Sequence, residues 1–157
     1  MKEINRRTFM QGTLAASVVA VAAGAGLLKP SRVLAAEWPK GAFASKSVDE
    51  ALKTLYGTNQ MSASSSIKIK APLQAENGAV VPMQVATTLP NIEAISVYVA
   101  KNPAPLVANV GLTGAEGYFS ARMKMGSTSD VVAVVKSGGK LYSAKQTVKV
   151  TVGGCGG

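Results

Sequence analysis

Histidine is absent from this chain of 157 residues, and cysteine occurs once, at position 155. Because histidine is the commonest metal ligand and the commonest general base, its absence excludes the usual catalytic triads and most metal sites. A single cysteine also excludes an intrachain disulfide framework and any cysteine cluster. The remaining candidates for acid–base chemistry are carboxylates, and these are dispersed along the sequence. We therefore expect no catalytic side chain, no metal site and no cofactor in this chain.

Acidic residues are few, with 8 Asp and Glu against 17 Lys and Arg, and aromatic residues make up only 5% of the chain. Residues 1–35 carry +4 of the net charge of +9, because they hold five basic residues and one acidic residue. Residues 36–157 therefore carry a net charge of +5, mostly as scattered lysines without interleaved aromatics. This pattern excludes a nucleic-acid partner, and it leaves a modest attraction for small anions or an acidic protein.

The sequence also lacks a hydrophobic run long enough to span a bilayer comfortably. Its longest apolar stretch, residues 12–28, contains three glycines and falls short of the roughly 20 residues that a spanning helix needs. Arg6 and Arg7 precede this stretch, and small residues favour cleavage after Ala35, with a cut after Ala36 as the alternative. We predict that residues 1–35 are a twin-arginine signal peptide for export to the periplasm, without stable membrane insertion. A retained membrane anchor is the alternative interpretation.

Export by the twin-arginine route has a consequence for partners. This route carries folded cargo, often because a cofactor or a partner must be acquired inside the cell. Since the chain offers no cofactor site, we expect a partner protein that is exported together with it.

The first regular element expected after the leader is a helix over residues 47–56. Ser47 and Glu50 form a capping box, and Gly57 is a suitable C-terminal stop. The helix has one apolar stripe, which needs a surface to cover on the β domain or on a partner. The stripe consists of Val48, Ala51, Leu52, Leu55 and Tyr56.

From residue 64 onward the hydrophobic pattern has a period of two, which is typical of strands separated by Gly, Pro and Asn turns. We predict an all-β, immunoglobulin-like antiparallel β-sandwich of about seven strands over residues 64–152, preceded by an N-terminal segment, 36–63, that carries the helix. Pro82 suggests an edge or bulged strand. The Gly-rich stretch 111–117 is interpreted as a hairpin connection, and 62–66 as a flexible connector. The seven candidate strands are Ser65–Lys70, Val80–Thr87, Ile92–Val99, Leu106–Gly111, Gly117–Met125, Asp130–Lys136 and Lys140–Val152.

Residues 153–157 read Gly-Gly-Cys-Gly-Gly and directly follow the last predicted strand. Glycine has no Cβ, so we expect Gly153, Gly154, Gly156 and Gly157 to form a flexible arm that is sterically open around the sulfur of Cys155. Such an arm would carry the thiol roughly 10 Å beyond the sheet. The thiolate is the nucleophilic form of cysteine. No histidine exists to activate it, so the activating group must come from another protein.

Three other interpretations of Cys155 remain open at this stage. In the first, the tail is plain disorder, and in the second, the cysteine forms an intermolecular disulfide in a structural or chaperone-like periplasmic protein. A thiol-disulfide redox protein is the third, weakened by the absence of a second cysteine. A covalent carrier arm is the interpretation that the residues favour.

The C-terminal stretch 148–157, ending in Gly-Gly-Cys-Gly-Gly, resembles the end of the SoxY family, sulfur carriers of bacterial thiosulfate oxidation. Residues 102–108, 122–124 and 130–134, and the twin-arginine leader, are also similar to that family. The resemblance covers essentially the whole chain after the leader.

This resemblance implies an immunoglobulin-like sandwich that forms a heterodimer with a SoxZ-like subunit. It further implies that Cys155 is the site of covalent substrate attachment, loaded with thiosulfate by a SoxAX-like c-type haem enzyme. A SoxB-like dimanganese hydrolase would then release sulfate, and a SoxCD-like sulfur dehydrogenase, where present, would oxidise the remaining sulfur. The chain itself would be a carrier and not an enzyme.

Overall fold

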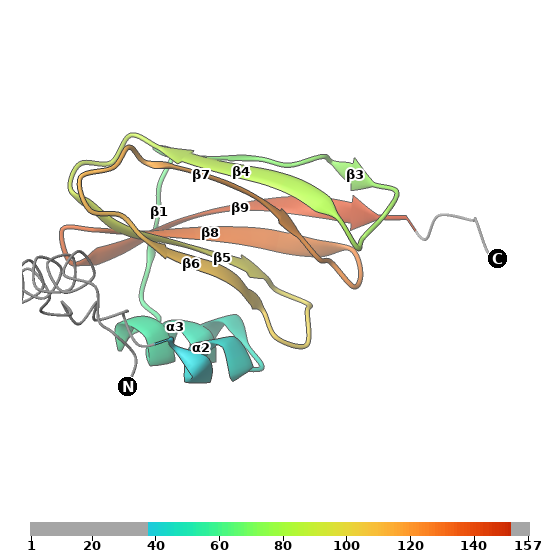
Figure 1. Cartoon of the computed structure of the whole chain (residues 1–157), viewed down its shortest axis with the longest axis horizontal. Helices are drawn as coiled ribbons and strands as arrows, with labels where there is room; N and C mark the ends of the chain where they lie inside the picture. The colour runs from blue at the N-terminus through green and yellow to red at the C-terminus, as the bar shows by residue number, and fades with distance from the viewer. Residues whose placement is uncertain (1–37, 152–157) are drawn as a thin grey trace, which may run out of the picture. The chain divides into compact units, whose positions relative to one another are not determined.

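The computed structural model describes residues 38–151, which form two packed β-sheets with two short helices on one side (Figure 1). Every strand expected from the sequence is present, and two further strands of two residues each are added. The described elements are α2 (Lys40–Ala44), α3 (Val48–Tyr56), β1 (Ser62–Ala63), β2 (Ile67–Lys70), β3 (Gln74–Ala75), β4 (Val81–Thr87), β5 (Ile92–Val99), β6 (Leu106–Gly111), β7 (Tyr118–Met123), β8 (Ser129–Ser137) and β9 (Lys140–Val150).

The larger sheet has the strand order β1-β9-β8-β5-β6, with β3 also paired to β9, and the smaller sheet has the order β2-β4-β7. The long pairs are antiparallel, as the alternating pattern indicates. The two short strands β1 and β3 are the exception, because both run parallel to β9. The expected all-β sandwich is therefore confirmed, with two parallel pairings added along one strand.

The main hydrophobic core lies between the two sheets. Alternate residues of the long strands point inward, so that Val85 of the smaller sheet and Val97 and Val135 of the larger sheet are fully buried. Each fully buried side chain of this size stabilises the fold by about 1.5–3 kcal/mol. This core makes the sandwich a firm support for the segment that follows β9.

Helix α3 has the predicted N-terminus and the predicted stop. Ser47 Oγ accepts a hydrogen bond from the Glu50 N–H at 3.2 Å, and Gly57 ends the helix at φ 75°. The Glu50 carboxylate reaches one residue further back than a standard capping box, because it accepts from the Lys46 N–H at 2.8 Å. The helix begins at Val48, one residue later than the predicted range of 47–56, because Ser47 is its N-cap, and it ends at Tyr56 as predicted.

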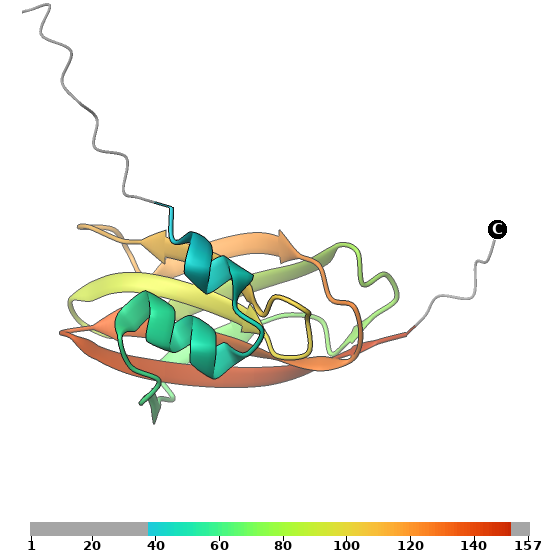
Figure 2. The same cartoon turned by 90° about the horizontal axis from the view of Figure 1, so that it is seen from below.

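The apolar stripe of α3 packs on the face of the larger sheet that points away from the smaller one, where α2 joins it (Figure 2). Leu52 is fully buried there against the sheet residues Tyr98 and Val134. This second hydrophobic cluster confirms that the helix covers the β domain. Neither helix among residues 38–151 is long and apolar enough to cross a membrane.

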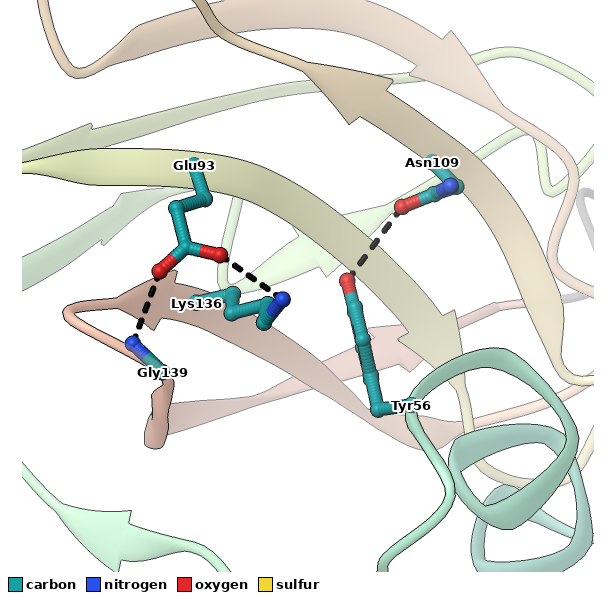
Figure 3. A network of polar contacts seen from close by, with 5 residues as sticks. All are labelled: Tyr56, Glu93, Asn109, Lys136 and Gly139. Carbon is teal, nitrogen blue, oxygen red and sulfur yellow. Dashed lines mark hydrogen bonds and ion pairs between the residues drawn. The ribbon is translucent and has the colours of Figure 1, made fainter. Parts of the chain in front are cut away.

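Tyr56 also ties the helix to the sheet through its hydroxyl group. The hydroxyl hydrogen is shared between Ser96 Oγ at 3.0 Å and Asn109 Oδ1 at 3.2 Å, the latter contact being drawn in Figure 3. Burial raises the pKa of Tyr56, and the hydrogen bond to Ser96 offsets only part of that rise. Tyr56 thus stays a neutral hydrogen-bonding group in the helix–sheet interface.

Three local expectations were wrong. Strand β4 is the middle strand of its sheet and not an edge strand. Pro82 is tolerated because it pairs with β7 alone, since the pairing with β2 extends only as far as Gln84. The stretch 111–117 is no hairpin either, because it leads from β6 in the larger sheet to β7 in the smaller one. Ser62 and Ala63, expected in a connector, form β1.

Candidate functional site at the end of strand β9

The cysteine and glycines singled out in the sequence lie outside the described residues. These are Gly153, Gly154, Cys155, Gly156 and Gly157. The last residue described is Thr151, four positions before Cys155. The part of the candidate site that the structure defines is therefore the root of this segment, residues 148–151, with the residues that hold it.

Strand β9 changes neighbours as it approaches its end. It pairs with β8 as far as Val148, which lies opposite Ser129. Beyond that point β3 becomes the neighbour on the opposite edge, and Lys149 N–H donates to Leu73 O at 2.9 Å. Thr151 N–H then donates to Ala75 O at 3.0 Å. The two-residue strand β3 thus extends the paired length of β9 to the last described residue (Figure 1).

Thr128, just before β8, holds the other edge of the root. Its Oγ1 accepts a hydrogen bond from the Val150 N–H at 3.0 Å and lies 3.5 Å from the Val150 carbonyl oxygen, to which it donates. The backbone of residues 149–151 is therefore held from both sides, although its surroundings are largely exposed. A segment attached here starts from a fixed point and a fixed direction.

The turn beside β3 packs closely against the root. The Gly78 carbonyl accepts from the Met125 N–H at 2.7 Å. A Cβ on Gly78 would overlap the Met125 carbonyl oxygen and lie 3.0 Å from Val150 Cγ1. Glycine is required here because the turn backbone passes directly over these atoms. Asn77 shapes the same turn, since its Oδ1 accepts from the Ala79 N–H at 2.9 Å.

Charged residues near the root are mostly basic. Lys149 is exposed two residues before Thr151, whereas Lys145 lies six residues before it, roughly 20 Å along the strand. Lys149, and not Lys145, is therefore the exposed lysine of β9 at the root. Lys101 and Lys124 are exposed in loops at the same end of the sandwich.

A small cleft of about 210 Å³ also opens near the root. Asp130 lines it together with Lys101, so the two charges oppose each other, and the Asp130 carboxylate accepts a hydrogen bond from Thr147 Oγ1 at 2.5 Å. Within residues 38–151 no three His, Cys, Asp or Glu side chains gather into a metal site. The described residues around the root can therefore position the segment that follows them and attract charged groups.

Sequence reasoning missed the residues that hold the root. Gly78 belongs to one of the Gly and Asn turns that separate the predicted strands, and Thr128 and β3 were not singled out. The turn signal at 76–78 was the only available hint, because the partners of residues 149–151 lie more than twenty positions away along the chain.

Comparison with known proteins gives consistent results. The family model described as "Sulfur oxidation protein SoxY" matches residues 52–155, a span that includes Cys155. The solved structure of the sulfur carrier protein SoxY from Chlorobium limicola f thiosulfatophilum is similar, with 40% sequence identity and a TM-score of 0.63. That similarity covers 72% of this chain and 99% of that one. No curated protein matches at a significant level.

A superoxide reductase (neelaredoxin) from Ignicoccus hospitalis is a more remote likeness. It shares 20% identity over 55% of this chain and 80% of its own, with a TM-score of 0.49, and no inference rests on it. The family match covers well over half of the chain, and the Chlorobium structure is matched along nearly its whole length. The chain therefore belongs to the SoxY family of sulfur oxidation proteins.

Proposed function

We propose that this protein is a covalent carrier of sulfur intermediates in thiosulfate oxidation, with Cys155 as the point of attachment. The observation that carries the proposal is the family match, which extends to residue 155 and therefore includes the sole cysteine. The similar Chlorobium protein is named a sulfur carrier. The two-sided anchoring of residues 149–151 supports the same role, because a carrier segment needs a fixed base.

The loading step joins the Cys155 sulfur to the terminal sulfur of thiosulfate. One S–S bond forms, the thiol loses its proton, and two electrons leave. Cys–SH and S₂O₃²⁻ thus give Cys–S–S–SO₃⁻, one proton and two electrons. The electrons pass to a SoxAX-like c-type haem enzyme. Because the chain contains no histidine, the base that accepts the thiol proton also belongs to the partner.

The release step is a hydrolysis. Water attacks the sulfonate sulfur, the S–SO₃ bond breaks, and sulfate leaves with one proton while the persulfide Cys–S–SH stays on the carrier. A SoxB-like dimanganese hydrolase supplies the metal chemistry. A SoxCD-like sulfur dehydrogenase, in organisms that have one, oxidises the remaining sulfur. The carrier contributes no catalytic side chain to either step.

The contribution of the carrier is retention and delivery. The glycines at 153, 154, 156 and 157 keep the backbone slim beside the sulfur, so that the segment can enter a narrow active site. The covalent bond prevents loss of a small reactive anion between enzymes. We propose that the carrier works in the periplasm as a heterodimer with a SoxZ-like subunit, after twin-arginine export and cleavage of residues 1–35.

Intact-mass measurement of the protein purified from cells supplied with thiosulfate tests this function. We expect adducts with the mass of one sulfur atom or of an S–SO₃ group on the peptide that contains Cys155. A Cys155→Ser variant should carry no adduct and should still copurify with its partner subunit. A disulfide-linked dimer without sulfur adducts would instead support the structural protein, and loss of the partner in the Ser variant would support an interfacial disulfide.

A further inference from the structure

The short distance between the root and Cys155 limits where a partner enzyme can sit. Cys155 is four residues beyond Thr151, and four fully extended residues span roughly 13–14 Å. An active site that receives the sulfur must therefore lie within about that distance of Thr151. Because active sites are recessed, the protein surface around such a site must approach the residues that surround the root. Every enzyme that uses Cys155 meets this same part of the carrier.

Two large apolar side chains are exposed at this place. Leu73 has 76% of its surface exposed, the highest value among the large hydrophobic residues of the described chain, and Val80 has 53%. They flank β3 and its turn, Leu73 just before β3 and Val80 just before β4. Exposed apolar side chains that lie together mark sites of protein interaction more often than single scattered ones do.

Both side chains are fixed relative to the root. The Leu73 carbonyl accepts the hydrogen bond from Lys149 N–H at 2.9 Å, so Leu73 is the immediate neighbour of β9. Val80 lies two residues after Gly78, whose backbone is packed against Val150, and its N–H donates to Asn77 O at 3.4 Å. The apolar pair is therefore presented on ordered backbone, which lowers the entropy cost of binding.

Charged side chains of both signs surround the pair. Lys101, Lys124 and Lys149 are exposed at this end of the sandwich, Glu76 is exposed in the turn between Leu73 and Val80, and Asp130 accepts a hydrogen bond from Thr147. Three lysines against two carboxylates leave the margin of this apolar centre weakly positive, which fits a surface that is apolar around its opening and acidic further out. Such charge complementarity raises the association rate more than the final affinity.

We propose that Leu73 and Val80 form a docking collar that contacts the apolar rim around the active-site opening of each enzyme that takes up Cys155. This inference rests on the proposed carrier function and extends it to the mode of enzyme recognition. Two side chains make a small patch, whereas stable interfaces bury roughly 1,200–2,000 Å² in total. A small patch suits brief encounters with several enzymes in turn, and it argues against a second copy of the chain as the occupant.

The test uses the mature chain with its partner subunit and the thiosulfate-conjugating haem enzyme of the same Sox system. Three variants are compared with the wild type: Leu73→Gln, Val80→Thr, and the matched control Tyr118→Thr. Tyr118 is also large and exposed, at 52%, but lies at the opposite end of the sandwich. Loading is followed by intact mass over a range of carrier concentrations, and the Cys155 thiol is alkylated with iodoacetamide in parallel. Melting temperatures verify that all variants fold.

We expect Leu73→Gln to raise the KM for the carrier about tenfold and Val80→Thr several-fold, with kcat and the alkylation rate unchanged. Tyr118→Thr should leave the KM within twofold of the wild type. An unchanged KM in both collar variants, with loading still dependent on Cys155, overturns the docking collar and leaves the carrier function standing. A change of oligomeric state at unchanged KM also overturns it, in favour of contact between copies. If the wild type is never loaded, the carrier function fails and the collar fails with it.

Discussion

The two ends of the sandwich are built with the same tight backbone packing but expose different chemistry. At the end where β9 stops, Gly78 packs against Met125 and Val150, and apolar side chains face solvent nearby. At the opposite end, Gly117 packs equally tightly, and a polar network lies at the surface, with Tyr118 as the exposed large side chain beside it. There the Glu93 carboxylate accepts from Lys136 Nζ at 2.7 Å and from the Gly139 N–H at 2.7 Å (Figure 3). The end beside Gly117 is therefore the polar end, and the end beside Gly78 is the apolar end to which we assign enzyme docking.

The two ends also differ in the shape of their surface. A wide, open cleft of about 750 Å³ lies at the polar end, beside Thr87 and Tyr118, far along the strands from the root. Glu116 is the only charged residue that lines it. This cleft is larger than the one near the root, so surface shape alone would have directed attention away from the root.

The largest expected effect comes from filling the two tight glycine positions. In Gly117→Ala the new Cβ would lie 2.5 Å from Ile92 Cδ1 and 2.6 Å from the Thr87 carbonyl oxygen, and Gly78→Ala creates a similar overlap. We expect each substitution to lower the free energy of unfolding by about 1–3 kcal/mol, measured by denaturant titration. Only Gly78→Ala should also slow enzymatic loading of the folded protein, because it displaces the root. Equal loading by both variants would contradict the functional difference between the ends.

A smaller effect is expected from Thr128→Val. The variant keeps the side-chain volume and removes the acceptor of the Val150 N–H, at a cost of about 0.5–1.5 kcal/mol in a partly exposed site. Amide hydrogen exchange at Val150 should become several-fold faster. The matched control is Ser137→Ala, which removes the hydrogen bond from Ser137 Oγ to Pro90 O at the polar end. If the control accelerates exchange at Val150 as much, the root is not held locally by Thr128.

The smallest expected effect is on the pH dependence of stability, and it arises from Glu93 at the polar end. Hydrogen bonds from Lys136 and from the Gly139 N–H hold the pKa of Glu93 below its usual value of 4.5. The unfolded chain therefore binds more protons than the folded chain in acid, so this contribution to stability is present above pH 4.5 and is lost as the pH falls below it. We expect Glu93→Gln to flatten this acid limb in thermal melts and to leave loading at neutral pH unchanged. A steeper acid limb in the variant would show that the sign is wrong.

Long elements with strong local signals were predicted well from the sequence. The bounds of β5 and β6 agree residue for residue with the prediction, because Asn91 and the prolines at 103 and 105 punctuate the hydrophobic runs. Helix α3 was predicted from Ser47 and Gly57 for the same reason. The two-residue strands β1 and β3 and the five-residue helix α2 were missed, since their pairing and packing depend on distant partners and not on a local pattern.

The candidate site also contains both residues that could be predicted from the sequence and residues that could not. Cys155 stands out in the sequence because it is the only thiol and lies among glycines. The role of Thr128 was not predictable, because its partner Val150 is 22 positions away and a threonine in a turn is unremarkable by itself. Leu73 was not predictable as an exposed residue either, since a leucine between Pro72 and a short strand looks like a core position until the fold is known.

The length of β9 has a mechanical consequence. The strand pairs with β8 over nine positions, from Lys140 to Val148, and with β3 beyond that. A tension applied to the segment after Thr151 acts along the strand axis, while the ladder hydrogen bonds lie across it. Such a load shears many bonds together and cannot peel them apart one at a time. An enzyme that grips the end of the chain can therefore pull on it without unravelling the strand to which it is attached.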